Sequence, residues 1–314
     1  MTILRIILNM KKADGNRRRF TSVFFCDIIE PKTASGENIM KINLPQLYFS
    51  KLMRAIVEFE MIENGDHILL GISGGKDSIF LAYAMAILRE RLKKDFCLSA
   101  LNINPMFQPE FNVAPVAEFC ASLGIPFATR EVDIAGAIQG QAGKKACFTC
   151  SYFRRGAINR YAKEHGMNKI AYAHHHDDAV ETFFMSLLYS GQLTTFSPVT
   201  YLDRTDLTVI RPLIYFREDE LREAGKYHGC TPIPSPCPLD GKTMRQKTKE
   251  LIAELGRDNP LVYDHLASAM RKGSLGELWP AAKTRDEMKE TYYRYMNPFC
   301  HPKEGKSQER TNVI

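Results

Sequence analysis

The chain has 314 residues, of which 45% are hydrophobic and 25% charged, a composition that excludes a disordered chain and predicts a folded globular protein. This length allows one large α/β domain with appendages or two smaller domains. Forty-two Lys and Arg against 36 Asp and Glu give a formal net charge of +6, which suits a polyanionic partner without requiring one. There is no apolar run of the ~18 to 20 residues that a membrane span needs, and the N-terminal segment lacks the order of a secretory signal. We therefore expect a cytoplasmic protein with no membrane partner.

Residues 1–39 show neither helical nor strand periodicity. They carry a Lys-Lys and an Arg-Arg-Arg cluster and a turn-rich PKTASGEN stretch just before Met40. The composition favours a poorly ordered or mis-assigned extension ahead of a true start at Met40. The alternative is a basic arm that contacts RNA.

After Met40 the sequence predicts regular structure again. Apolar residues recur at helical spacing from Phe49 to Met61, which predicts an amphipathic helix, and Asn64-Gly65 is a signal for the end of that helix. Strands and helices then alternate. Strands are expected at 67–72, 96–103, 126–132, 169–174 and 208–213, and helices at 78–92, 113–123, 152–165, 178–188 and 218–228. This alternation predicts an α/β domain at 40–229: a parallel sheet with helices on both faces and ligands at the carboxyl ends of the strands.

The last part of the chain, 230–314, reads as an appendage rather than a second core. It begins with a Pro-rich hinge, TPIPSPCP, continues with helical patterns at 244–255 and 261–270, and ends in a polar tail.

A glycine-rich segment, Ser73-Gly74-Gly75-Lys76-Asp77-Ser78, lies between the first strand and the following helix. Backbone N–H groups and the positive end of the helix dipole converge there, and two glycines let an anion approach closely. The segment is not a Walker loop, which needs Gly at Leu70 and Ser or Thr at Asp77. An ordinary glycine turn is the alternative, but hydroxyls and Lys76 at this point favour a phosphate site.

SGGKDS in this position resembles the PP-loop of the ATP pyrophosphatase superfamily, whose members cleave ATP to AMP and pyrophosphate while adenylating a carbonyl oxygen. The resemblance implies an adenine nucleotide alpha hydrolase-like fold. It also implies that Ser73 to Ser78 hold pyrophosphate-side oxygens of ATP, with Lys76 and Asp77 catalytic and Asp77 helping with Mg²⁺ or with pyrophosphate release. Asn102 and Ile103, at the end of the second strand, are then expected in the adenine pocket.

Eight cysteines are too few for a disulfide scaffold in a chain of this length, so their spacing matters more than their number. Cys147 and Cys150 form a Cys-x-x-Cys pair just before an expected helix, and Cys237 lies far along the chain in a rigid Pro-Cys-Pro. Three thiolates suit an iron–sulfur cluster with one iron left open. A redox pair and three unrelated cysteines are the alternatives.

Longer stretches resemble the tRNA 2-thiocytidine synthetase branch of the PP-loop enzymes. The matches, in order, are CFTCSYFRRGAINRYAKEHG, KIAYAHHHDDAVETFF, VIRPLIYFREDEL and PIPSPCPLDGK, and the resemblance spans about residues 51–270. It implies that Cys147, Cys150 and Cys237 ligate a [4Fe-4S] cluster. Asp240 replaces the second Cys of the family's Pro-Cys-x-x-Cys and Ala173 replaces a Gly. That second Cys is not one of the three ligands, so we expect its loss to be tolerated.

The run from His174 to Asp178 ends a strand and begins a helix. Successive residues of a strand point in alternating directions, so the three adjacent histidines cannot all meet one metal ion. Asp177 could simply cap the helix. The resemblance implies that His174, Asp177 and Asp178 lie beside the nucleotide and magnesium, with Asp178 catalytic, and that Arg211 faces the same region.

Basic residues flank the proposed cysteine site on both sides. Lys144, Lys145, Arg154 and Arg155 surround Cys-x-x-Cys, and further cations follow Cys237. Such runs of basic residues are usually solvated helix faces. Their position on both sides of the cysteine site favours a role in binding the phosphate backbone of a nucleic acid at that site. The nearby aromatics that could stack on bases are Phe148, Tyr152 and Phe153.

Taken together, the resemblance implies an ATP-dependent tRNA sulfurtransferase that adenylates the C2 carbonyl of an anticodon-loop cytidine and replaces oxygen with sulfur, using a [4Fe-4S] cluster. The expected partners are tRNA and a sulfur donor such as a cysteine desulfurase, with a homodimer as an option. The alternatives are a PP-loop thiolation or desulfidation enzyme acting on another RNA or base, and a non-catalytic cluster-carrying RNA binder.

Overall fold

The computed structural model describes residues 43–108, 110–141, 143–271 and 284–296, so the extension 1–39 and the polar tail lie outside it. The chain divides between Ala267 and Ser268 into two units. No helix in the described ranges is both long and apolar enough to cross a bilayer.

In chain order the elements are α2 (Gln46–Glu58), β1 (Asp66–Gly71), α3 (Lys76–Arg91), β2 (Phe96–Asn104), α4 (Ala114–Ser122), β3 (Phe127–Glu131), α5 (Ile134–Ala137), α6 (Gly143–Glu164), β4 (Lys169–Ala171), α7 (His176–Ser190), β5 (Val199–Leu202), β6 (Leu207–Ile210), α8 (Glu218–His228), α9 (Met244–Asp258), α10 (Val262–Arg271) and α11 (Arg285–Met296).

The first unit is built on a six-stranded sheet in the order β3-β2-β1-β4-β6-β5. Neighbouring strands from β3 to β6 run parallel, and β5 pairs with β6 antiparallel at the edge. The predicted parallel sheet is confirmed. Since the chain winds outward from β1 to β3 and then returns to β4, the strand order reverses between β1 and β4, and ligands of such sheets bind at this switch point.

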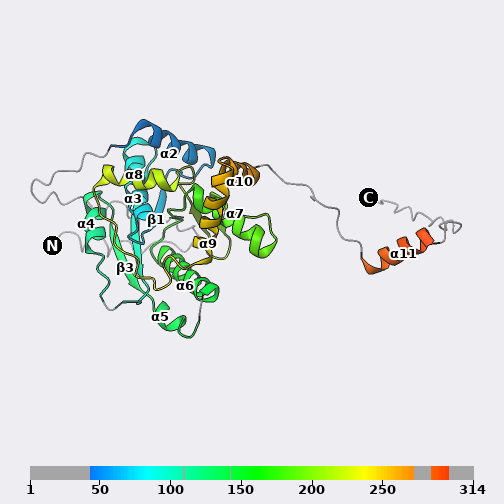
Figure 1. Ribbon diagram of the computed structural model, residues 1–314. Helices are drawn as coiled ribbons and strands as arrows, with labels where there is room; N and C mark the ends of the chain where they lie inside the picture. The colour runs from blue at the N-terminus through cyan, green and yellow to red at the C-terminus, as the bar shows by residue number, and fades with distance from the viewer. Residues whose placement is uncertain (1–42, 109, 142, 272–283, 297–314) are drawn as a thin grey trace, which may run out of the picture. The chain divides into compact units, whose positions relative to one another are not determined.

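Helices cover both faces of the sheet (Figure 1). On one face, Ile158 and Ala162 of α6 pack against Leu69, Leu101 and Ile170 of the strands. On the other face α3 packs against β1 and β2 and is itself covered by α8. The side chains of α3 from Ser78 to Leu88 are all buried, which fits a segment that is apolar all round rather than on one stripe.

The structure differs from the sequence-based expectation at two places that matter for the site. First, α6 begins at Gly143 rather than 152, so Cys147 and Cys150 lie inside the helix and not before it. Ala146 is buried, and this tertiary contact extends the helix into a segment whose glycines suggested a loop. Second, the unexpected strand β5 forms a hairpin with β6, with Asp206 at a positive φ of 51° in the turn.

The loop after β1 contacts the segment that carries Cys237. Gly74 has a φ of +86°, and its carbonyl accepts a hydrogen bond of 3.0 Å from the N–H of Ile233. A Cβ at Gly74 would lie 2.3 Å from Cγ1 of Ile233. Only glycine combines this φ with this close approach.

We expect Gly74→Ala to lower the free energy of unfolding by about 2 kcal/mol or more, because it adds a steric overlap to a strained φ. Gly65→Ala is a matched control: Gly65 has a φ of +83°, and a Cβ there would meet nothing within 4 Å. Urea unfolding of both variants measures the difference. Equal losses would show that the contact with Ile233 contributes nothing.

Candidate functional site

A cavity of about 590 Å³ opens at the carboxyl ends of the strands, beside the switch point. It is lined by three groups of residues that are far apart in the sequence: Ser73, Gly75, Asp77 and Ser78 after β1; Cys147, Cys150, Arg154 and Arg155 on α6; and Ile233 and Cys237 from the Pro-rich segment. Tyr172, His174 and Asp178, after β4, complete the wall on the side of α7. The phosphate loop and the three thiols therefore face one space.

Hydrogen bonds within the loop fix its shape. The hydroxyl of Ser78 accepts from the N–H of Gly74 at 3.1 Å and donates to the carbonyl of Gly75 at 2.9 Å. The hydroxyl of Ser73 accepts from the N–H of Gly75 at 3.3 Å and donates to Ser78. The first N–H groups of α3 have no partner inside the helix, and with the helix dipole they favour an anion at this point.

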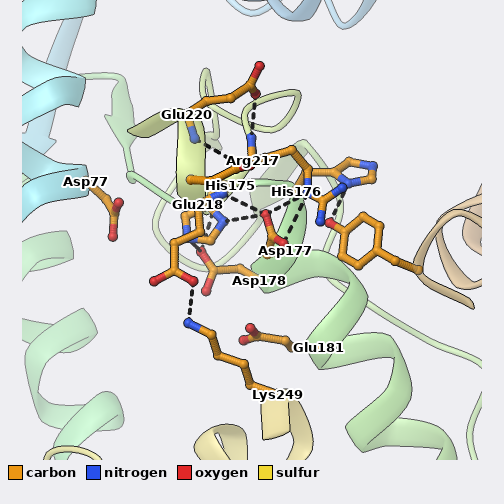
Figure 2. Close-up of polar contacts among 12 residues, drawn as sticks. Asp77, His175, His176, Asp177, Asp178, Glu181, Arg217, Glu218, Glu220 and Lys249 are labelled. Atoms are coloured by element: carbon orange, nitrogen blue, oxygen red, sulfur yellow. Dashed lines mark hydrogen bonds and ion pairs between the residues drawn. The ribbon is translucent and has the colours of Figure 1, made fainter. Parts of the chain in front are cut away.

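Lys76 is held by carboxylates in this structure. Its ammonium lies 3.0 Å from both carboxylate oxygens of Asp77 and 3.4 Å from Glu218 of α8. Lys249 of α9 also donates to Glu218, as Figure 2 shows. Burial alone raises the pKa of Glu218, but the two ammonium groups outweigh it and lower the pKa to about 2. Glu218 is thus held ionised between Lys76 and Lys249, and the guanidinium of Arg222 lies 3.7 Å from the same carboxylate.

His174 and Tyr172 are half-buried polar residues of the cavity wall. Burial lowers the pKa of His174 to about 4, against the opposing effect of Asp178, and raises the pKa of Tyr172 to about 12. Both side chains are therefore neutral at neutral pH. Neither the hydroxyl of Tyr172 nor Nδ1 of His174 has a hydrogen-bond partner among the described residues. Both residues line the cavity, and a buried polar atom without a partner is uncommon in a folded protein.

The three adjacent histidines diverge, as the alternation along a strand predicts. His174 packs between Tyr172 and Phe196. The ring of His175 lies 3.5 Å from the carboxylate of Asp178, and Nδ1 of His176 lies 2.8 Å from the hydroxyl of Tyr263. They do not converge on one ion.

Asp177 and Asp178 have different surroundings (Figure 2). Asp177 accepts from Nε of Arg217 at 3.2 Å and from the N–H of Glu218 at 2.8 Å, so it caps the neighbouring helix α8 instead of its own. It is not among the residues that line the cavity. Asp178 does line it, and its two oxygens accept from the N–H of His175 and from Arg245 of α9.

Arg245 links α9 to α7 through hydrogen bonds. Its guanidinium donates to Asp178 at 3.1 Å, to Glu181 at 3.3 Å and to Thr182 at 3.0 Å. The Glu181 carboxylate is buried, and this charge-assisted contact compensates for its lost hydration. Arg245 therefore supports the wall that Asp178 contributes.

The thiols of Cys147 and Cys150 both have raised pKa values. Burial raises the pKa of Cys147, and the neighbouring Cys237 raises it further. Burial also raises the pKa of Cys150, although Arg154 lowers it. Among the described residues no three His, Cys, Asp or Glu are close enough to hold one metal ion. In an iron–sulfur cubane each thiolate binds a different iron, so three thiols around one cavity fit a cluster better than a single ion.

The other residues expected to contact the nucleotide are placed differently from one another. Ile103 lines the cavity. Asn102 is buried behind it and donates to the carbonyl of Ile72 at 2.8 Å, which braces the end of β1. Arg211 donates to Ser197 and Thr200. Asn102, Arg211 and Lys76 do not line the cavity as the structure describes it.

The basic residues of α6 lie on different sides of the helix. Arg154 is half-buried and lines the cavity, and its buried Nε has no partner within the described residues. Arg155 lines the cavity and is also exposed, and Lys145 is exposed. The side chain of Lys144 lies outside the described part of the structure.

Three residues of the site carried no clear signal in the sequence. The sequence pattern predicts only that Tyr172 belongs to a strand and that Glu218 begins a helix. Arg245 reads as one of several cations after Cys237. Glu218 and Arg245 act through contacts between segments far apart in the sequence, which periodicity does not report: Glu218 contacts Lys249, 31 positions away, and Arg245 contacts Asp178, 67 positions away.

The neutral His174 makes stability depend on pH. The unfolded chain takes up a proton on this side chain below about pH 6.5, whereas the fold resists protonation down to about pH 4. Stability is therefore present above pH 6.5 and is lost as the pH falls. We expect His174→Gln to remove about 2 kcal/mol of the loss between pH 7 and pH 5, measured by urea unfolding. Exposed His265→Gln is the control, and equal pH dependence in both variants would contradict the assignment.

Comparisons with known proteins identify the family to which the chain belongs. Residues 47–250 match the family model described as a PP-loop domain. The chain is 37% identical over 228 residues to the tRNA-cytidine(32) 2-sulfurtransferase of Ralstonia pickettii strain 12J, covering 71% of each chain. It is 34% identical to the protein of that name from Dichelobacter nodosus strain VCS1703A, covering 70% of this chain and 83% of the relative.

Among solved structures, the U34-tRNA thiolase NcsA from Methanococcus maripaludis, described with its [4Fe-4S] cluster, superposes with a TM-score of 0.56. It shares 20% sequence identity, and the match covers 70% of this chain and 76% of that one, so it supports the fold. The family model and the sequence relatives decide the classification. The chain belongs to the PP-loop family, in the branch of the tRNA-cytidine(32) 2-sulfurtransferases.

Proposed function

We propose that this protein is an enzyme, an ATP-dependent tRNA sulfurtransferase that thiolates C2 of a cytidine in the anticodon loop. The observation that carries the proposal is the shared cavity, because a phosphate loop and three thiols face the same space. The relatives named as tRNA-cytidine(32) 2-sulfurtransferases support the substrate and the reaction.

The chemistry explains why the two groups share a cavity. The C2 carbonyl oxygen attacks the α-phosphorus of ATP and pyrophosphate leaves. Sulfide then adds at C2, and AMP leaves with the original oxygen. The products are a thiocarbonyl, AMP and pyrophosphate. Because the adenylated base would react with water, adenylation and sulfur transfer need one protected space.

The phosphate loop is proposed to bind the pyrophosphate side of ATP. Ser73, Gly74, Gly75 and Ser78 offer N–H groups and hydroxyls, and α3 offers its positive end. ATP phosphates would replace Asp77 and Glu218 as the partners of the Lys76 ammonium, while Lys249 keeps Glu218 neutralised. Asp77 and Asp178 line the cavity and are the carboxylates that we propose for Mg²⁺. Ile103 is proposed to contact adenine, with Asn102 and Arg211 supporting that wall.

Cys147, Cys150 and Cys237 are proposed to hold a [4Fe-4S] cluster. When bound, such a group leaves one iron without a protein thiolate, and that iron can carry the sulfide. Around it the chain supplies a half-buried pocket, Arg154 beside Cys150, and the neutral side chains of Tyr172 and His174, which can hydrogen-bond the target base.

For partners, we propose tRNA and a sulfur donor such as a cysteine desulfurase. Lys144, Lys145, Arg154 and Arg155 are the proposed contacts with the RNA backbone. A homodimer fits the proposal but is not needed for it, since one chain supplies both halves of the cavity. Cytoplasm is the compartment expected for tRNA modification.

The cluster proposal is tested by iron content and activity. Protein prepared anaerobically should contain about four irons per chain. Replacing Cys147, Cys150 or Cys237 singly with Ala should remove both the iron and the RNA thiolation that mass spectrometry detects. Cys230→Ala is the matched control, because Cys230 is a half-buried free thiol outside the cavity lining. Stoichiometric zinc without iron would refute the cluster.

The nucleotide proposal is tested with Lys76. We expect Lys76→Ala to keep the iron content but to slow RNA-dependent pyrophosphate release by about a hundredfold or more, because it removes a cation from the leaving phosphates. Lys249→Ala is the control: it removes a different cation from Glu218, leaves Lys76 in place and should have the smaller effect. Full turnover by Lys76→Ala would leave the loop as a structural turn only.

A further inference from the structure

The outer face of α6 carries large aromatic side chains in water. Phe148 is 67% exposed and Tyr152 64% exposed. Lys145, Phe148, Tyr152 and Arg155 follow one another at spacings of three, four and three residues, so they share one face of the helix. We call these four residues the α6 stripe. Phe153, 42% exposed, lies beside it and packs edge-on against Tyr152.

The α6 stripe reaches the opening of the cavity. Cys147, Cys150 and Arg154 are on the inner side of the same helix and line the cavity. Arg155 belongs to both sets, because it is exposed and also lines the cavity. A molecule lying on the stripe would therefore reach the thiols within about one helical turn.

The charge of α6 indicates what kind of molecule this is. Between Gly143 and Glu164 the helix contains one carboxylate, that of Glu164. It contains six cations: Lys144, Lys145, Arg154, Arg155, Arg160 and Lys163. Exposed aromatic rings between cations of one sign match a strand that offers both phosphates and unstacked bases. An apolar protein surface would match the rings but not the cations.

We propose that Phe148 and Tyr152 form a stacking platform for unpaired bases of the RNA substrate. This inference rests on the proposed function and adds how the loop is recognised: ring faces select unpaired nucleotides, and Lys145 and Arg155 hold the adjoining phosphates. A duplex keeps its base faces covered by neighbouring pairs and cannot occupy the platform. Unpaired flanking bases on the platform would leave the target base free to enter the cavity.

The test is the binding of two labelled RNAs, an anticodon stem-loop and a fully paired duplex of equal length, followed by fluorescence anisotropy. Phe148→Leu and Tyr152→Leu keep an apolar side chain and remove the aromatic face. Each should weaken stem-loop binding by roughly fivefold or more and leave duplex binding unchanged. Tyr201→Leu is the matched control, since Tyr201 is 62% exposed on the edge strand β5.

The salt dependence separates stacking from charge. The leucine variants should keep the wild-type slope of log affinity against log salt, whereas a Lys145→Gln/Arg155→Gln double variant should reduce it by up to about two phosphate contacts. Unchanged stem-loop binding by both leucine variants, or equal losses with the duplex, would overturn the platform while the sulfurtransferase proposal stands. Failure of the wild type to bind the stem-loop at all would overturn both.

Discussion

The close approach of two chain segments at Gly74 is the constraint on which the site depends. The hydrogen bond between Gly74 and Ile233 joins the phosphate loop to the segment that carries Cys237, across 159 positions of sequence. Without a side chain at Gly74, the side chain of Ile233 can lie against the loop. This contact, together with the position of α6 over the same end of the sheet, brings the thiols to the phosphate loop and gives the proposed reaction a single chamber.

A network of ion pairs links the helices behind the wall of that chamber. Asp177 joins α7 to α8 through Arg217, Glu218 joins α8 to α3 and α9, and Arg245 joins α9 to α7. The guanidinium of Arg217 also lies 3.5 Å from the centre of the Tyr263 ring of α10. Removing one partner from such a half-buried network leaves another charge poorly compensated, so these contacts fix the relative positions of the helices more than they add net stability.

The parts of the fold that local physics determines were predictable from the sequence. The run from Ser73 to Ser78 is recognisable as a phosphate loop because glycines, hydroxyls and a cation follow a buried strand. The alternation of strands and helices predicts the parallel sheet. The beginning of α6 was not predictable, because the burial of Ala146 against the rest of the protein overrides the glycine-rich sequence before it. Strand β5 has only four residues and depends on its hairpin partner β6.

In the candidate site, too, some features were predictable from the sequence and others depend on the fold. Cys147, Cys150 and Cys237 were recognisable as chemistry-bearing residues, but only the fold places them on one cavity with Asp178. Asp177 was expected beside the nucleotide and instead caps α8, because its carboxylate meets the N–H of Glu218. Glu218 and Arg245 matter through contacts that join distant segments, and a single sequence carries no record of such contacts.

The burial of α3 on every side has a mechanical consequence. A helix enclosed all round by close-packed side chains has little room to shift, so the phosphate loop at its N-terminus is attached to a rigidly packed element. Helix α6 has the core on one side and solvent on the other, and its thiols share the cavity with that loop. A shift of α6 would therefore displace fewer packed neighbours than a shift of α3, and a change in the width of the cavity would cost less on the side of the thiols than on the side of the phosphate loop.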